Sequence, residues 1–155
     1  MQSGAHDKRR RTRMRIILDT NVELSALLWR GKPFQLFEAI RRRGDMRLYS
    51  SAALLEELAD VLTRPSATKR LAIIGKTGRE VLADYVLAVE MVEPVEVPRV
   101  VPGDEDDDHV IAAAVAARSA LIVSGDSDLL SMGSHRGIDI ITAPMAVRTV
   151  EASRA

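Results

Sequence analysis

Two short apolar runs, each followed by an acidic residue, limit most strongly what this chain can fold into. Residues 15–19 read Arg-Ile-Ile-Leu-Asp, and residues 120–126 read Ala-Leu-Ile-Val-Ser-Gly-Asp. Continuous runs of β-branched and aliphatic residues are typical of strands covered on both faces, as in parallel sheets. We therefore predict two buried parallel strands here, with two weaker strand candidates at residues 46–50 and 138–141.

Segments with helical character lie between these strands. The helix predicted at 51–63 follows Ser51 as a candidate cap and carries its apolar residues on one stripe, namely Leu54, Leu58, Val61 and Leu62. Further helices are predicted at 33–43, at 77–92 (where residues 77–80 form a capping-box sequence) and at 108–117. This alternation of strands and helices predicts an α/β fold with a mostly parallel sheet.

Length and composition fit one domain that can bury a core. The chain has 155 residues, 46% of them hydrophobic, and a mean hydropathy of −0.01. It contains no cysteine, which rules out disulfides and thiolate metal sites and is typical of a reducing cytoplasm. No apolar run approaches the roughly 18 residues of a membrane span. We predict a cytoplasmic protein with a basic arm at 1–13 and a single domain at 14–150, with Met14 as an alternative translation start.

Acidic residues follow the predicted strands and begin or line the predicted helices. Asp19 and Asp126 come after the two strongest strands, at the sheet edge where α/β proteins bind ligands, and Asp128 lies two positions further on. Asp108 begins the helix at 108–117, and Glu57 lies beside the apolar stripe of 51–63. Crowded carboxylates cannot all stay ionised without a cation. Ligation by oxygen alone selects Mg²⁺ or Mn²⁺ over zinc, and such an ion activates water for attack on a phosphodiester.

At two positions in this acidic set, the sequence does not decide which of several neighbouring acids is the ligand. Glu56 is the immediate neighbour of Glu57 and has the same chemistry. Asp107 or Asp104 replaces Asp108 as the ligand if the helix begins earlier than residue 108. A lone acid at a strand end is more often a turn or cap residue, so the hypothesis rests on the group rather than on any single member.

The basic residues gather in two segments, one at residues 1–15 and a second stretch after the first strand. We call the second stretch the basic patch; it consists of Arg30, Lys32, Arg41, Arg42, Arg43 and Arg47. Because RNA is a polyanion, we predict that Arg41, Arg42 and Arg43 contact RNA beside the acidic crevice. The alternative is that these residues form a solvated helix face.

Four short blocks of the chain resemble those of the PIN domain family. They are Leu-Asp-Thr-Asn at 18–21, Ser-Ala-Ala-Leu-Leu-Glu-Glu-Leu at 51–58, Asp-Glu-Asp-Asp-Asp-His-Val-Ile-Ala at 104–112 and Val-Ser-Gly-Asp-Ser-Asp-Leu-Leu at 123–130. Each block is short, but their order and spacing cover most of residues 14–145. The likeness is greatest to the VapC-like PIN toxins of bacterial and archaeal toxin–antitoxin pairs.

The resemblance implies a Rossmann-like α/β/α sandwich that cleaves RNA with Mg²⁺ or Mn²⁺. It also implies a homodimer and a small antitoxin partner. By position, the metal-binding and catalytic acids implied by the resemblance are Asp19, Glu57, Asp108 and Asp126. Asp128 is then an accessory acid, and Asn21 and Ser124 match polar residues that orient water or a ligand. Ser124 stands where the family more often has Thr, which keeps the hydroxyl.

Two other functions compete with this one. A phosphohydrolase of the haloacid dehalogenase type also begins with an Asp after a strand, but it needs a second Asp where Asn21 stands and a catalytic Lys. A non-catalytic PIN-like module would bind RNA or a protein, but a face that only binds RNA should not gather negative charge against phosphates. We therefore predict a metal-dependent endoribonuclease acting as a toxin.

Overall fold

A central sheet organises the computed structural model, which describes residues 14–95, 99, 101 and 105–153. Within these residues six strands have the order β3-β2-β1-β4-β6-β5. The parallel strands are β1 (Met14–Leu18), β2 (Met46–Ser50), β3 (Val89–Met91), β4 (Leu121–Val123) and β6 (Ile138–Ile141). The short β5 (Ser134–His135) runs antiparallel to β6. The predicted mostly parallel α/β sheet is confirmed, whereas the arm predicted at 1–13 lies outside the described residues.

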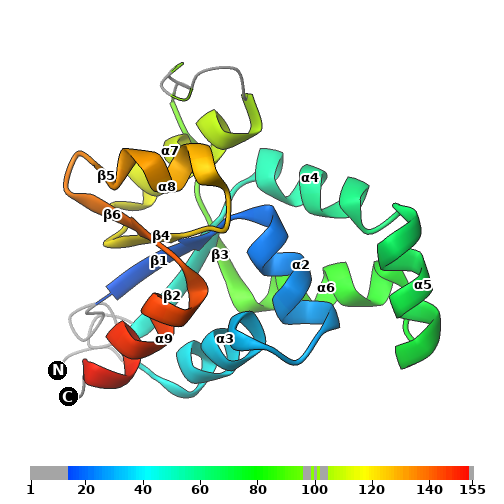
Figure 1. The fold of residues 1–155 in the computed structure, drawn as a ribbon. Helices are drawn as coiled ribbons and strands as arrows, with labels where there is room; N and C mark the ends of the chain where they lie inside the picture. Colours follow the sequence, from blue (N-terminus) through cyan, green and yellow to red (C-terminus); the bar gives the residue numbers. More distant parts are fainter. Residues whose placement is uncertain (1–13, 96–98, 100, 102–104, 154–155) are drawn as a thin grey trace, which may run out of the picture.

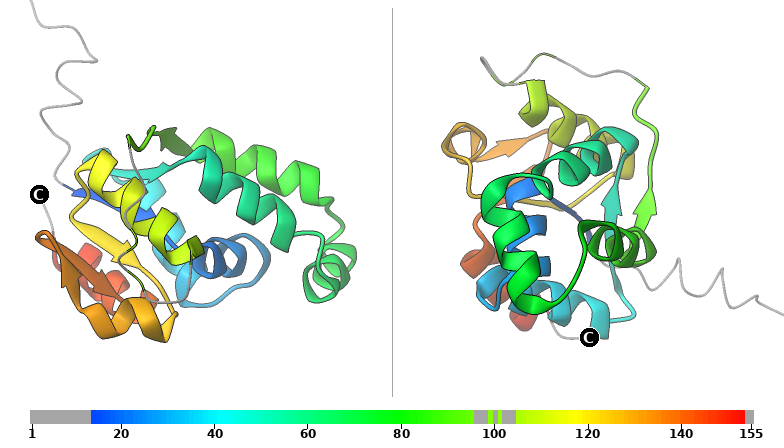
Figure 2. Two further views of the ribbon diagram at one scale, coloured as in Figure 1. Left: turned by 90° about the horizontal axis from the view of Figure 1, so that it is seen from above. Right: turned by 90° about the vertical axis from the view of Figure 1, so that its right-hand side faces the viewer.

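Helices cover both faces of this sheet (Figure 1). One layer contains α2 (Thr20–Leu28), α3 (Lys32–Arg42) and α9 (Ala143–Ala152), and the opposite layer contains α7 (Glu105–Ala117) and α8 (Ser127–Met132). Three further helices, α4 (Ala52–Val61), α5 (Pro65–Ile74) and α6 (Gly78–Ala88), lead away from the sheet and return to it (Figures 1 and 2). The architecture is the predicted Rossmann-like α/β/α sandwich.

Alternation along the central strands divides the core between the two helical layers. Ile16 and Leu18 of β1 pack with the layer of α2, α3 and α9, whereas Ile17 packs against α7. Ile122 of β4 lies beside Ile17 in the sheet and joins the same cluster as Ile17. Because each face of β1 is covered, all three side chains are fully buried, which explains the uninterrupted apolar run in the sequence.

Several element boundaries follow directly from local sequence. The strands at 46–50 and 138–141 are confirmed, and so is the cap of α4, where the Ser51 hydroxyl accepts from the Leu54 N–H at 3.3 Å. The capping box is also confirmed: the Thr77 N–H donates to the Glu80 carboxylate at 2.9 Å, and the Glu80 N–H donates to the Thr77 hydroxyl at 3.1 Å.

Asp19 follows β1 and caps α2, since its carboxylate accepts the Thr20 N–H. Two predicted helix boundaries were wrong. The helix predicted at 108–117 already begins at Glu105. The helix predicted at 77–92 ends at Ala88, because Val89–Met91 pair with β2 as an additional strand. In the described part of the chain, no helix is long and apolar enough to cross a membrane.

The tight packing of α7 on the sheet makes a testable prediction. Ala113 is fully buried in α7, whereas Ala116 on the same helix is exposed. We expect Ala113→Val to lower the free energy of unfolding by about 1–3 kcal/mol more than Ala116→Val, because added methyl groups at a filled position force side chains and backbone to shift. The control shares the helix-propensity cost of valine, so urea denaturation of both variants isolates the packing effect. Equal losses would show that α7 is not closely packed.

Candidate metal centre

Asp19 is held at the carboxyl edge of the sheet by hydrogen bonds to both of its oxygens. Its backbone N–H donates to the Val123 carbonyl at 2.9 Å, which joins the ends of β1 and β4. Its Oδ1 accepts from the Thr20 N–H and its Oδ2 from the Ser124 hydroxyl, each at 2.7 Å. With only 7% of its surface exposed, Asp19 is an oriented carboxylate rather than a solvated turn residue.

Ser124 connects Asp19 to Asp126. While its hydroxyl donates to Asp19, the same oxygen accepts from the Asp126 N–H at 2.9 Å. Asp126 in turn caps α8, where its Oδ1 accepts from the N–H groups of Asp128 and Leu129 at 2.8 and 3.2 Å. The fully buried Ser124 therefore fixes the spacing between the two acids that follow β1 and β4.

Glu57 reaches the same edge from α4. Its Oε1 accepts from the Thr20 hydroxyl at 3.2 Å, so Thr20 contacts Asp19 through its N–H and Glu57 through its side chain. Glu57 is partly buried, whereas its neighbour Glu56 is exposed. Of the two glutamates left open by the sequence, Glu57 is the one that faces the site.

Three acids stand close enough together to share one cation. Carboxylate oxygens of Asp107, Asp126 and Asp128 lie within 4.8 Å of one another. Asp107 is buried, Asp126 partly buried and Asp128 exposed, so the group opens to solvent on one side. The donors are all carboxylate oxygens, the ligands that hard divalent cations prefer.

Asp108, the residue predicted to be a ligand, lies outside this group of three. Its Oδ1 accepts from the Val101 N–H at 2.8 Å, and its Oδ2 lies 3.4 Å from Nε of Arg99. Because α7 begins at Glu105 rather than at residue 108, neighbouring acids in its first turn point in different directions. Asp107 faces Asp126 and Asp128, while Asp108 holds the segment that precedes the helix.

Glu23 is a buried acid that sequence reasoning missed. It lies one turn after Asp19 in α2 and is fully buried. Burial raises the pKa of its carboxyl to about 8; the Tyr85 hydroxyl opposes this rise, and the charges of Asp19 and Glu57 add to it. The carboxylate oxygens of Glu23 and the hydroxyl of Tyr85 have no hydrogen-bond partner at normal distance and angle among the described residues. The sequence contained a signal for this residue, because Glu23 is an acid beside Val22 and Ala26, with which it shares the buried side of α2.

The remaining predicted residues lie at different edges of the sheet. Asn21 is exposed in the first turn of α2, near Asp19. Arg41 and Arg42 end α3, and the following strand β2 begins beside Met14, at the amino end of β1. Arg41, Arg42 and Arg43 were predicted to lie beside the acids. This prediction of their location was wrong, because α3 returns the chain to the opposite edge of the sheet.

Arg43 is already bound within the fold. Its guanidinium forms two hydrogen bonds with the Asp45 carboxylate, at 3.0 and 2.9 Å, and these hold the pKa of Arg43 above its usual value. It also donates to the carbonyls of Val150 and Ser153 at the end of α9. Arg43 joins α3 to α9 and caps the latter, a structural role.

Comparison with known proteins places the chain in a family. Residues 15–128 match the PIN domain, so the chain belongs to the PIN domain family. Members of this family are generally nucleases that use divalent metals. No match is found among curated protein sequences.

One solved structure has a similar fold. It is the crystal structure of VapBC2 from Rickettsia felis bound to a DNA fragment from their promoter. The match has a TM-score of 0.56 and 11% sequence identity, and it covers 83% of this chain and 98% of the other. At this identity the likeness concerns the fold, and it agrees with the α/β/α arrangement described above.

The different orientations of Asp107 and Asp108 make a prediction. We expect Asp107→Asn to weaken Mn²⁺ binding by about tenfold or more, since removal of even an outer partner of a metal site costs that much. Asp108→Asn should leave Mn²⁺ affinity within about threefold, because the amide oxygen still accepts from Val101 and no ligand is lost. Calorimetric titration of both variants measures this. The reverse ranking would restore Asp108 as the ligand.

The buried Glu23 predicts a pH dependence of stability. The unfolded chain releases this proton near pH 4.5, whereas the folded protein keeps it up to about pH 8. The free energy of unfolding therefore falls as pH rises through this window, by about 1.4 kcal/mol for each unit between the two pKa values. Glu23→Gln removes this pH dependence. The free energy of unfolding of the variant, relative to that of the parent, should therefore rise between pH 5 and about pH 8 when both are measured in EDTA. A constant difference across this range, measured by urea denaturation, would contradict the assignment.

Proposed function

We propose that this protein is an endoribonuclease that uses Mg²⁺ or Mn²⁺ to cleave RNA phosphodiester bonds. The observation that carries the proposal is the convergence of Asp107, Asp126 and Asp128 beside Asp19 at the carboxyl edge of the sheet. Ligands bind at this edge in open α/β sheets, and membership of the PIN domain family supports nuclease chemistry there. We assign the nuclease domain to residues 14–150.

The acids divide into ligands and residues that orient them. Asp107, Asp126 and Asp128 would hold the ion, and Asp19 lies beside Asp126 through Ser124. We assign to Asp107 the ligand position predicted for Asp108, because Asp108 is engaged by Val101 and Arg99. Asn21, exposed at the start of α2, is the polar residue placed to orient water or a phosphate oxygen.

The chemistry follows from this arrangement. A bound divalent ion lowers the pKa of coordinated water and offsets the charge that develops on the phosphodiester. Hydrogen bonds to both of its oxygens hold the Asp19 carboxylate in place beside these acids. Glu57, oriented by Thr20, is the carboxylate that accepts the proton of the attacking water.

We also propose that the protein is the toxin of a toxin–antitoxin pair, acting as a cytoplasmic homodimer with a small antitoxin. The fold likeness to VapBC2 supports this, since that structure is described as bound to DNA from its own promoter. A neighbouring reading frame for a small DNA-binding protein, whose product forms a complex with this chain, tests the pairing. Isolation of the two products as separate proteins after coexpression would contradict it.

Substitution of the acids tests the nuclease directly. We expect Asp19→Asn and Glu57→Gln each to abolish metal-dependent cleavage of labelled RNA, while Glu56→Gln, at the exposed neighbouring position, keeps the parental rate. Asp19→Asn should keep or raise the melting temperature without metal, because one of several crowded anions is removed. Gel analysis of the cleavage products with Mg²⁺, Mn²⁺ or EDTA measures the effect. Parental cleavage by Asp19→Asn would disprove the proposed site.

A further inference from the structure

The cations of the basic patch differ in whether the fold already neutralises them. Arg43 is bound by Asp45 and the end of α9, and Nε of Arg47 lies 3.3 Å from the Glu90 carboxylate. Arg41 lies 3.9 Å from Glu38 on its own helix, with its guanidinium 5.3 Å from the centre of the Phe37 ring. These three arginines have local partners.

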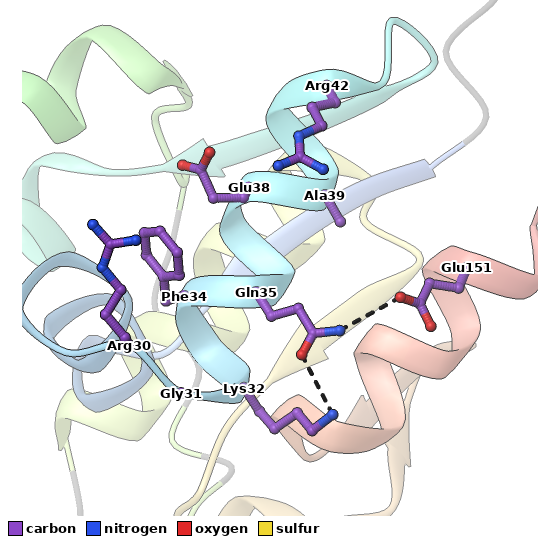
Figure 3. A pocket seen from close by; sticks show the side chains of 9 residues that line it. All are labelled: Arg30, Gly31, Lys32, Phe34, Gln35, Glu38, Ala39, Arg42 and Glu151. Atoms are coloured by element: carbon purple, nitrogen blue, oxygen red, sulfur yellow. Dashed lines mark hydrogen bonds between the residues drawn. The ribbon is translucent and has the colours of Figure 1, made fainter.

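Arg30, Lys32 and Arg42 differ from these three, because no acidic group pairs with them in the described part of the chain. Among the residues that the structure describes, none of the three has an acidic oxygen within 4.0 Å. All three line one hollow of about 770 Å³ between α3, α9 and the loop that joins α2 to α3 (Figure 3). Three cations from separate turns of the chain therefore surround one open space.

Two acids, Glu38 and Glu151, also line the hollow. Glu38 faces Arg41, and Glu151 accepts from the Gln35 amide at 3.5 Å. The other end of Gln35 accepts from Nζ of Lys32 at 3.4 Å, which holds the ammonium at the rim (Figure 3). With three cations against these two acids, and with Glu38 beside Arg41, the hollow has an excess of positive charge, which suits an anionic strand.

Aromatic rings accompany these cations. The Arg30 guanidinium lies 4.5 Å from the centre of the partly buried Phe34 ring. Next to Arg30 in the chain, Trp29 is 39% exposed and has the Arg70 guanidinium 5.8 Å from its ring. A cationic groove with exposed ring or guanidinium faces is what a single nucleic-acid strand needs, because its unpaired bases can stack there. Duplexes keep their bases stacked inside and gain nothing from such faces.

The length of α2 separates the hollow from the candidate metal centre. This helix begins next to Asp19 and ends at Leu28, so its nine residues span about 14 Å. A strand cut at the metal centre reaches the hollow only if it extends several nucleotides beyond the cleaved bond. The acids of the metal centre repel phosphates, so positive charge at a second place on the protein would add to RNA binding.

From these observations, and resting on the proposed ribonuclease function, the structure assigns the hollow between α3 and α9 as an RNA-binding site separate from the cleavage site. Arg30, Lys32 and Arg42 contact phosphates of a single strand there, and Phe34 lines the same hollow. Trp29, which precedes Arg30 and is exposed, offers a stacking surface next to the hollow. The predicted RNA contact is thereby reassigned from Arg41 and Arg43 to the cations that the fold leaves without acidic partners.

Binding of a labelled single-stranded RNA oligonucleotide to the Asp126→Asn protein in EDTA tests this assignment without cleavage. The triple variant Arg30→Ala, Lys32→Ala, Arg42→Ala should lower the slope of log affinity against log salt by about 2, at about 0.7 for each phosphate contact. All three side chains are exposed, so the fold should survive. The matched control is Arg64→Ala, Lys69→Ala, Lys76→Ala, which removes the same charge from exposed positions outside the hollow and should keep the parental slope.

Three outcomes would overturn the assignment: equal slopes for both triple variants, no detectable RNA binding by the parent, or equally tight binding of duplex DNA with the same loss in the variant. Cleavage by the chain with Asp126 intact is measured in parallel. A smaller salt slope in the Arg30, Lys32, Arg42 variant, together with no RNA cleavage by the parent chain with either metal, would support the RNA-binding site and contradict the nuclease function. RNA cleavage by the parent chain, together with equal salt slopes, would support the nuclease function and contradict the RNA-binding site.

Discussion

Parallel pairing of β1 with β4 brings together residues that are distant in the chain, and the candidate site depends on it. The hydrogen bond from the Asp19 N–H to the Val123 carbonyl continues this pairing past the end of β1. One residue further along, the Ser124 hydroxyl reaches Asp19 across 105 positions and positions the Asp126 backbone. A change in strand register would move each of these groups to the other face of the sheet. The buried core on both faces of β1 therefore specifies the geometry of the acids.

Gathering carboxylates at one edge costs free energy, and the fold lowers that cost locally. Asp19 and Asp126 cap helices, and Asp107 lies in the first turn of α7, where backbone N–H groups stabilise negative charge. Beneath them Glu23 avoids a further charge, since burial favours its neutral form. The remaining repulsion among Asp107, Asp126 and Asp128 is what a divalent cation would relieve.

The basic patch also contains residues that the fold neutralises and residues that it leaves without acidic partners among the described residues. Ion pairs with Asp45 and Glu90 make Arg43 and Arg47 part of the structure, whereas Arg30, Lys32 and Arg42 face an open hollow. Net charge is zero, so composition alone contains no sign of this division. The candidate metal centre and the cationic hollow lie at opposite ends of α2, and a flexible polyanion is long enough to contact both.

Local sequence alone determined the α/β class, the strands at 46–50 and 138–141, the caps at Ser51 and Thr77, and the acids that follow the central strands, because these depend on neighbouring residues and on hydrophobic periodicity. Only the tertiary structure decided which acids meet. Because α7 begins at Glu105 and not at residue 108, both Asp107 and Asp108 are helical, and successive helical residues point about 100° apart. Asp107 therefore faces Asp126, whereas Asp108 faces Arg99. Likewise, β3 and the partners of Arg43 exist only through contacts with distant segments, which no local pattern in the chain encodes.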